Sequence, residues 1–447
     1  MIDPTPHLER FESYEQACRE FRWRVPEQLN IACAISKRHK DAVTRIAISD
    51  VRPGGINTYT YGGIDFLSDK FANLLAGSGV RQGDAVAVIL SQSAAPLVAH
   101  FAALKLGAVV VPLSPSLPSS TLRVALTQCT ARAVVADGTA VDKVSEALTT
   151  EPLFVAGGGS RGDHSSGKQR DFWREINSAS SDFTPVVTSS NSPAYLFFLP
   201  DTEGGLTGVI HSPRSLVGQL TAFEMYTNFS IDDESVFWLA SDWTSPQTLL
   251  GMVIPALWYG CSIVAQDSIN SGGDEFFASM GQFEVTDAFI PSPEMNRLMQ
   301  TLDALPIKHD LKLKTILTTP DAFTQKLCDW VSDSLGATLN VAYGAAETGI
   351  IASSCGKWFA CDAGTAGRAA PGHSIEIVDE RGDAKPVSQR GRVALSRFDP
   401  ALFLGYLNDS EKYVARLAGD WFVTGDAGYK KEDGDLCLSP SPTVFGG

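Results

Sequence analysis

The sequence predicts an α/β fold with largely parallel sheets, and three observations support this prediction. Helical and strand patterns alternate along the chain from about residue 57. Two of the strand patterns, "DAVAVIL" (84–90) and "VVVPLS" (109–114), are continuous apolar runs, as expected for strands covered on both faces. Two of the helical patterns stop at a glycine, which commonly follows the end of a helix. Regular helix–strand alternation favours parallel sheets because each crossover returns the chain to the same edge.

The first half of the chain contains this alternation in order. Apolar residues at three- and four-residue steps predict helices over 62–80, 93–108 and 121–131, and "AVVAD" predicts a strand over 133–137. The stretch 156–192 is rich in Gly, Ser and charge, so we expect a long surface connection there. Gly157, Gly159 and Gly162 form a G-x-G-x-x-G pattern in it, but a polar segment follows them instead of a helix. We therefore interpret the pattern as part of a loop.

The second half resumes the alternation beyond residue 195. Strands are predicted in "SIVAQD", "AFIPS", "TILTT" and "LNVAYG". After about residue 373 the pattern changes to short β-type runs, "SIEIVD" and "RVALSRF", with turns between them. This change predicts a smaller β-rich subdomain.

Composition excludes several classes of protein. The net charge of −15 and the lack of a basic run argue against nucleic-acid binding. The longest apolar stretches, such as 249–260, are shorter than the roughly 18 residues of a membrane span, and the N-terminus has no secretory pattern. The eight cysteines include no C-x-x-C pair, so we expect reduced core cysteines, no zinc site and a cytoplasmic protein.

A glycine-containing loop at 197–212, "FFLPDTEGGLTGVIHS", is the first candidate site. An aromatic strand enters a turn with Gly204, Gly205 and Gly208, and glycines allow backbone N–H groups to approach an anion closely. The loop nevertheless lacks lysine, and Asp201 and Glu203 stand where a polyphosphate would lie. The residues alone leave open a nucleotide site, an impaired one, or an ordinary turn.

Two later motifs carry a resemblance to a known family. "YGAAETG" (343–349) and "WFVTGDAGYKKEDGDL" (421–436) resemble motifs of the adenylate-forming enzymes, which include acyl-CoA synthetases, luciferases and peptide-synthetase adenylation domains. The segments 85–115, 256–267 and 402–426 are also similar to that family. The resemblance covers roughly residues 30–438, and its texture is closest to acetate-like and medium-chain acyl-CoA synthetases.

The resemblance implies a fold and a reaction. The fold is the large N-terminal domain of the family, with two α/β sheet subdomains in 1–372, a distorted β-barrel subdomain in 373–438 and a hinge remnant in 439–447. The reaction joins a carboxylic acid to ATP, with Mg²⁺, to give an acyl-adenylate, which CoA or a carrier thiol then attacks. This implies an AMP-forming acid–CoA ligase, or its adenylating core, acting in fatty acid metabolism.

The same resemblance assigns roles to single residues. Glu347 would bind Mg²⁺, Tyr343 would stack against adenine, and Asp426 would hold the ribose hydroxyls. The alternatives are a solvated acid, a half-buried core aromatic and a turn-capping aspartate. The resemblance assigns Glu347 and Thr202 to catalysis. The residues it assigns to nucleotide binding are Thr202, Gly204, Gly205, Gly208, Asp321, Tyr343, Gly344, Ala346 and Asp426.

Departures from the family pattern support a second hypothesis. The family's loop lysine is Thr207 here, and its Ser-Gly pair is Pro200-Asp201. A carboxylate ~5 Å from a phosphate charge costs about 3 kcal/mol at an effective dielectric of 20, so ATP binding is expected to be impaired unless another cation compensates.

Two further departures point the same way. Ala346 replaces the threonine that precedes the motif glutamate, and the family's C-terminal lid domain is missing, either because the chain is partial or because the protein lacks it. The alternative function is therefore a catalytically silent relative that binds a nucleotide, an acyl group or a protein partner. Trp238 and Trp243 line the acid pocket or belong to the core.

Overall fold

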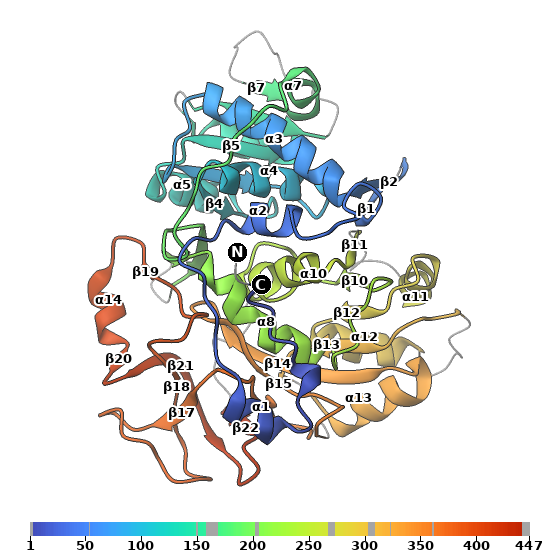
Figure 1. The fold of residues 1–447 in the computed structure, drawn as a ribbon, viewed down its shortest axis with the longest axis vertical. Coiled ribbons are helices and arrows are strands. Elements are labelled where there is room, and N and C mark those ends of the chain that lie inside the picture. Colours follow the sequence, from blue (N-terminus) through green and yellow to red (C-terminus); the bar gives the residue numbers. More distant parts are fainter. Residues whose placement is uncertain are drawn as a thin grey trace.

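Three β-sheets with their covering helices make up the protein (Figure 1). The structure is a computed structural model that describes residues 3–52, 54–148, 151–157, 169–201, 205–266, 273–302, 309–321, 323–359 and 362–439. The eight-stranded sheet has the order β19 (Gly405–Tyr406), β9 (Leu206–His211), β8 (Tyr195–Pro200), β4 (Val109–Pro112), β3 (Ala85–Ile89), β5 (Ala133–Asp137), β6 (Leu153–Ala156) and β7 (Gln169–Asp171). The nine-stranded sheet has the order β16 (Arg368–Ala369), β15 (Gly349–Ser353), β14 (Thr338–Ala345), β13 (Thr315–Thr318), β12 (Asp287–Phe289), β10 (Val236–Leu239), β11 (Ser262–Ala265), β1 (Ile46–Arg52) and β2 (Gly55–Thr60).

The smaller sheet is antiparallel and lies at the lower left of Figure 1, in orange and red. Its strands are β17 (Ile375–Val378), β18 (Gly391–Ser396), β21 (Trp421–Lys430) and β20 (Leu417–Ala418), and β22 (Leu436–Leu438) pairs with β21. In the larger sheets, by contrast, the central strands β3, β4, β5 and β10 to β14 pair in parallel, as the alternating pattern predicts.

Helices cover both faces of the two large sheets. The α-helices of the described residues are α1 (Tyr14–Glu20), α2 (Ile31–Ser36), α3 (Tyr61–Gly77), α4 (Ala94–Lys105), α5 (Ser119–Gln128), α6 (Val141–Ser145), α7 (Phe172–Ser178), α8 (Arg214–Tyr226), α9 (Pro246–Thr248), α10 (Ile254–Tyr259), α11 (Gly273–Gln282), α12 (Ser292–Leu302), α13 (Gln325–Trp330) and α14 (Ser410–Ala415). Successive residues of a strand then serve different cores. In β3, Val86 and Val88 face the core between the large sheets, whereas Ala87 and Ile89 face the core under α5 and α6. Double coverage explains why these strands are apolar without interruption.

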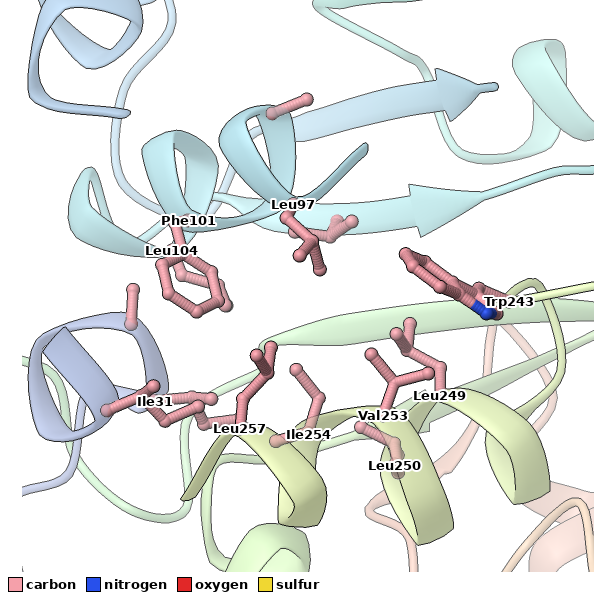
Figure 2. Packing of buried hydrophobic residues seen from close by; sticks show 14 of the residues in the cluster. Ile31, Leu97, Phe101, Leu104, Trp243, Leu249, Leu250, Val253, Ile254 and Leu257 are labelled. Atoms are coloured by element: carbon pink, nitrogen blue, oxygen red, sulfur yellow. The ribbon is translucent and has the colours of Figure 1, made fainter. Parts of the chain in front are cut away.

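Helix α4 lies between the two large sheets, and every one of its residues is buried. Figure 2 shows Leu97 and Phe101 of α4 pointing toward Val253, Ile254 and Leu257 on the opposite segment, within one hydrophobic cluster. A helix that is apolar on all sides requires partners all round, and α4 finds them here.

One charged residue of α4 is buried, and its two partners are partly exposed acids. Lys105 Nζ lies 2.5 Å from Asp65 Oδ1 and 2.6 Å from Asp69 Oδ1, both on α3. A buried ammonium is tolerated when carboxylates pair with it. The ion pairs therefore fix α3 against α4.

The fold class predicted from the sequence is confirmed, with two α/β sheets and a separate β-sheet. The surface connection predicted over 156–192 is wrong in part. Residues 169–171 form β7, and α7 follows with Asp171 as its N-cap, accepting from the Arg174 N–H. Phe172 and Ile176, four residues apart, are buried, so this short helix belongs to the core. Gly159 and Gly162 lie outside the described residues.

Among the described helices, none has both the length and the apolar character that a membrane span requires.

Candidate functional site

The glycine-containing turn joins β8 to β9, which pair as an antiparallel hairpin. Thr202, Glu203 and Gly204 lie outside the described residues. At the edges of this gap, the Asp201 N–H donates to Gly205 O over 3.0 Å, and the Gly205 N–H donates to Asp201 Oδ1 over 2.7 Å. A loop N–H that could bind an anion is thus already bonded to a carboxylate of the chain itself.

A pocket of about 420 Å³ opens beside this hairpin. Its lining includes Asp201 and Thr207 from the hairpin, Tyr406 from β19, and Asp409 and Lys412 from the segment that follows. Lys412 Nζ donates a hydrogen bond to Thr207 Oγ1 over 2.7 Å. The pocket therefore contains a cation that the sequence analysis missed, and a separation of 205 residues in sequence leaves no local signal for this contact.

Glu347 lies in the turn between β14 and β15 and is 9% exposed. Its Oε1 accepts a hydrogen bond from the Tyr406 hydroxyl over 2.6 Å, and its backbone carbonyl accepts from the Phe403 N–H. Burial, the nearby Glu347 charge and this hydrogen bond raise the pKa of the Tyr406 phenol. Tyr406 therefore remains a donor that orients the Glu347 carboxylate beside the pocket.

His211, at the end of β9, ties the hairpin to the same turn. Its Nε2 lies 2.7 Å from Ala346 O, so Nε2 carries the proton of the neutral ring and donates it. Burial lowers the pKa of His211 to about 4, although this hydrogen bond acts in the opposite direction. Ala346 thus has a visible structural role through its backbone carbonyl.

Tyr343 and Asp426 come together across 83 residues of sequence. The Tyr343 hydroxyl donates to Asp426 Oδ2 over 2.8 Å and lies 3.1 Å from Thr424 Oγ1. Tyr343 is fully buried on β14, whereas Asp426 on β21 is partly exposed. Burial raises the pKa of the Asp426 carboxyl, and the Tyr343 hydrogen bond and the Arg416 charge lower it.

Two of the predicted site glycines have packing roles. A Cβ at Gly208 would lie 2.7 Å from the Leu407 Cβ, because β19 pairs with β9 and Leu407, directly after β19, lies opposite Gly208. A Cβ at Gly344 would overlap the carbonyl oxygen of Gly349 on β15. Asp321 is exposed in the turn after β13, and the hydrogen bonds given for the described residues do not join it to Tyr343 or Asp426.

The two tryptophans considered for the acid pocket lie in the core. Trp238 is 1% exposed and stacks on Phe276, with ring centroids 4.9 Å apart. Trp243 is buried in the cluster between the large sheets and is visible at the edge of Figure 2. The structure thus favours the core interpretation for both.

One carboxylate cluster of the described residues has the spacing of a metal site. Asp362, Asp433 and Asp435 bring their oxygens within 4.8 Å of one another. Lys431 pairs with Asp362, and Arg368 pairs with Asp433 and Asp435. These two cations pair with all three acids, which gives the cluster a structural explanation.

Comparisons with known proteins match nearly the whole chain. A model of the AMP-binding enzyme family matches residues 35–407. The mitochondrial acyl-coenzyme A synthetase ACSM3 of Rattus norvegicus is 24% identical over 449 residues, covering 95% of this chain and 74% of the relative. The acetyl-coenzyme A synthetase of Streptomyces coelicolor is 25% identical over 453 residues, covering 93% of this chain and 68% of the relative.

A solved structure shares the fold. The acyl-CoA synthetase of Brucella canis superposes with a TM-score of 0.86 at 19% identity, covering 96% of this chain and 80% of that one. The family model spans well over half of the sequence, and both motifs of the resemblance lie in the described fold. The chain therefore belongs to the AMP-binding enzyme family, within the adenylate-forming superfamily that its motifs resemble.

Proposed function

We propose that this chain is an AMP-forming acid–CoA ligase. A carboxylate oxygen of the acid attacks the α-phosphorus of ATP, the bond to the bridging oxygen breaks, and pyrophosphate leaves with that electron pair. The thiol sulfur of CoA then attacks the acyl carbon, its proton passes to solvent, and AMP leaves. Family membership supports this proposal, and the observation that carries it is the meeting of Tyr343 with Asp426, which joins the two motifs.

The chain's own residues would act by binding and orientation. The Asp426 carboxylate would accept hydrogen bonds from the ribose hydroxyls of ATP. The hydroxyl of Tyr343 would hold that carboxylate in place. Stacking of Tyr343 on adenine stays a prediction. Positioning of this kind matters because a carboxylate is a weak nucleophile that the triphosphate repels.

Glu347 would carry Mg²⁺ when ATP is bound. The fit rests on its carboxylate, a hard oxygen ligand of the kind Mg²⁺ prefers, held by Tyr406 beside the pocket. The ion would neutralise charge on the leaving pyrophosphate. Glu347 itself would keep the metal-bearing phosphates at the pocket that Thr207 and Lys412 line.

Acid-dependent exchange of labelled pyrophosphate into ATP tests the proposal, followed by release of AMP and formation of a thioester with CoA. A panel of short-, medium- and long-chain and aromatic acids would identify the substrate class. We expect exchange with at least one acid and none without acid, whereas Asp426→Ala should lose it. Binding of AMP without exchange for any acid would overturn the ligase assignment.

That outcome would favour the second candidate, a silent relative that binds a nucleotide. The observation that favours it is the hydrogen bond from the Gly205 N–H to the Asp201 carboxylate, which leaves this N–H unable to bind a phosphate. The fatty-acid substrate class and a cytoplasmic location stay predictions, and one of the similar proteins carries the name of a mitochondrial enzyme.

A further inference from the structure

Helix α14 places one ammonium group against the hairpin of β8 and β9, which carries the glycine-containing turn. Lys412 Nζ lies 2.7 Å from Thr207 Oγ1 and 5.1 Å from the centroid of the Tyr406 ring. Tyr406 in turn donates to Glu347 Oε1. The ammonium, the phenol and the carboxylate thus form a line from the pocket to the turn between β14 and β15.

The described ion pairs do not account for the position of the Lys412 ammonium group. None of them includes Lys412, although 18 ion pairs join other groups, and its side chain is only partly exposed. A hydroxyl such as that of Thr207 leaves the charge of an ammonium uncompensated. An ammonium that no described carboxylate holds in an ion pair attracts the anion of a ligand.

The carboxylates of the pocket are engaged elsewhere. Asp409 caps α14 by accepting the Lys412 backbone N–H over 2.8 Å. Asp201 accepts the Gly205 N–H, as described above. Because these two acids line the pocket, a polyphosphate that carries a divalent cation suits it better than a bare one.

We propose that Lys412 is the cation that holds the outer phosphates of ATP in this chain, reaching from α14 to the position where the loop carries Thr207. This assignment rests on the proposed function, because it presumes that ATP occupies the site. Lys412 acts on the β- and γ-phosphates, so it distinguishes ATP and pyrophosphate from AMP. The pocket of about 420 Å³ that Thr207 and Lys412 both line has room for such a group.

Calorimetric titration with MgATP, Mg-pyrophosphate and AMP tests this role. Lys412→Gln should weaken MgATP and Mg-pyrophosphate binding at least tenfold, which corresponds to about 1.4 kcal/mol, and leave AMP binding within twofold. Lys40→Gln, an equal charge change at an exposed lysine, is the matched control and should leave all three affinities unchanged. Retained AMP binding shows that the variant is folded.

A more specific test moves the lysine from position 412 to position 207. Thr207→Lys alone places two ammonium groups together, so it should lower the midpoint of thermal unfolding and gain little ATP affinity. Thr207→Lys with Lys412→Thr returns the cation to the loop and should restore MgATP binding to within about threefold of the starting protein. A Lys412→Gln variant with an unchanged ratio of ATP to AMP affinity overturns the assignment and leaves the proposed function standing. Failure of the unmodified protein to bind either nucleotide overturns both.

Discussion

The hydroxyl of Tyr343 donates a hydrogen bond to Asp426 Oδ2 over 2.8 Å, which joins β14 of the nine-stranded sheet to β21 of the small sheet. The same hydroxyl lies against Thr424 Oγ1, which donates to Val393 O on the neighbouring strand. The position of the Asp426 carboxylate is therefore set by a buried ring on another sheet, and the small sheet contributes directly to the candidate nucleotide site.

Tyr343→Phe should change the pH dependence of AMP binding. The lost hydrogen bond favours the ionised carboxylate, so the pKa of Asp426, already raised by burial, should rise further. If the ionised form holds the ribose, affinity falls as the pH drops through this pKa, and the midpoint should move upward in the variant. Calorimetric AMP titrations between pH 4.5 and 8 measure it. Tyr59→Phe is the control, and identical midpoints would contradict the contact.

Substitution of Asp426 and of Glu347 should affect the binding of AMP and of MgATP differently. Asp426→Ala should weaken AMP binding by ~1.5–3 kcal/mol, the contribution of a hydrogen bond to a charged acceptor. Glu347→Ala should have little effect on AMP and a large effect on MgATP, because its role lies with the metal and the outer phosphates. Titration of both variants with both ligands decides the point. Equal losses with AMP would place the ribose elsewhere.

His211 should make the fold sensitive to acid. Its pKa is lowered to about 4 in the native state by burial, against roughly 6.5 in the unfolded chain. The unfolded state therefore binds the proton first, and stability present above pH 6.5 is lost as the pH falls toward 4, by up to about 3 kcal/mol. His211→Gln should reduce the slope of unfolding free energy with pH in this window by about 1.4 kcal/mol per pH unit. Urea titrations at several pH values measure it, and an unchanged slope would assign the acid sensitivity to other groups.

Lys105 should contribute strongly to stability. Lys105→Met leaves Asp65 and Asp69 without their buried counter-charge and should cost about 3 kcal/mol in urea unfolding, the lower end for a broken buried pair because both acids reach solvent. Adding Asp65→Asn and Asp69→Asn should recover most of this loss. Lys40→Met, at an exposed lysine, is the control. A loss no larger than that of the control would show that the pair is solvated.

Periodicity was sufficient for most elements of the large sheets. Continuous apolar runs mark β3 and β4 because both of their faces are buried, and Gly107, with φ of 70°, ends the α4 segment in the left-handed conformation that glycine adopts readily. Helix α7 was missed because it follows a polar, glycine-rich stretch. Its signal was present nonetheless, in the Asp171 cap and the spacing of Phe172 and Ile176.

The site was less accessible to sequence reasoning. The motifs pointed to Tyr343 and Asp426, but the hydrogen bond between them depends on how two sheets pack. Lys412 and Thr207 are 205 residues apart, and no periodicity reports a contact of that kind. Gly208 was read as a residue that makes room for phosphate, and its close neighbour in the fold is Leu407.

The burial of α4 on every side couples the thermal unfolding of the two large sheets. A single cluster of side chains joins the inner faces of both large sheets through this helix, so each sheet loses the core on its inner face when the other opens. The two sheets should therefore melt as one cooperative unit, with one calorimetric transition whose enthalpy matches the van't Hoff value. A substitution such as Phe101→Ala should then lower the melting temperature of both sheets together, including the hairpin that faces the candidate site.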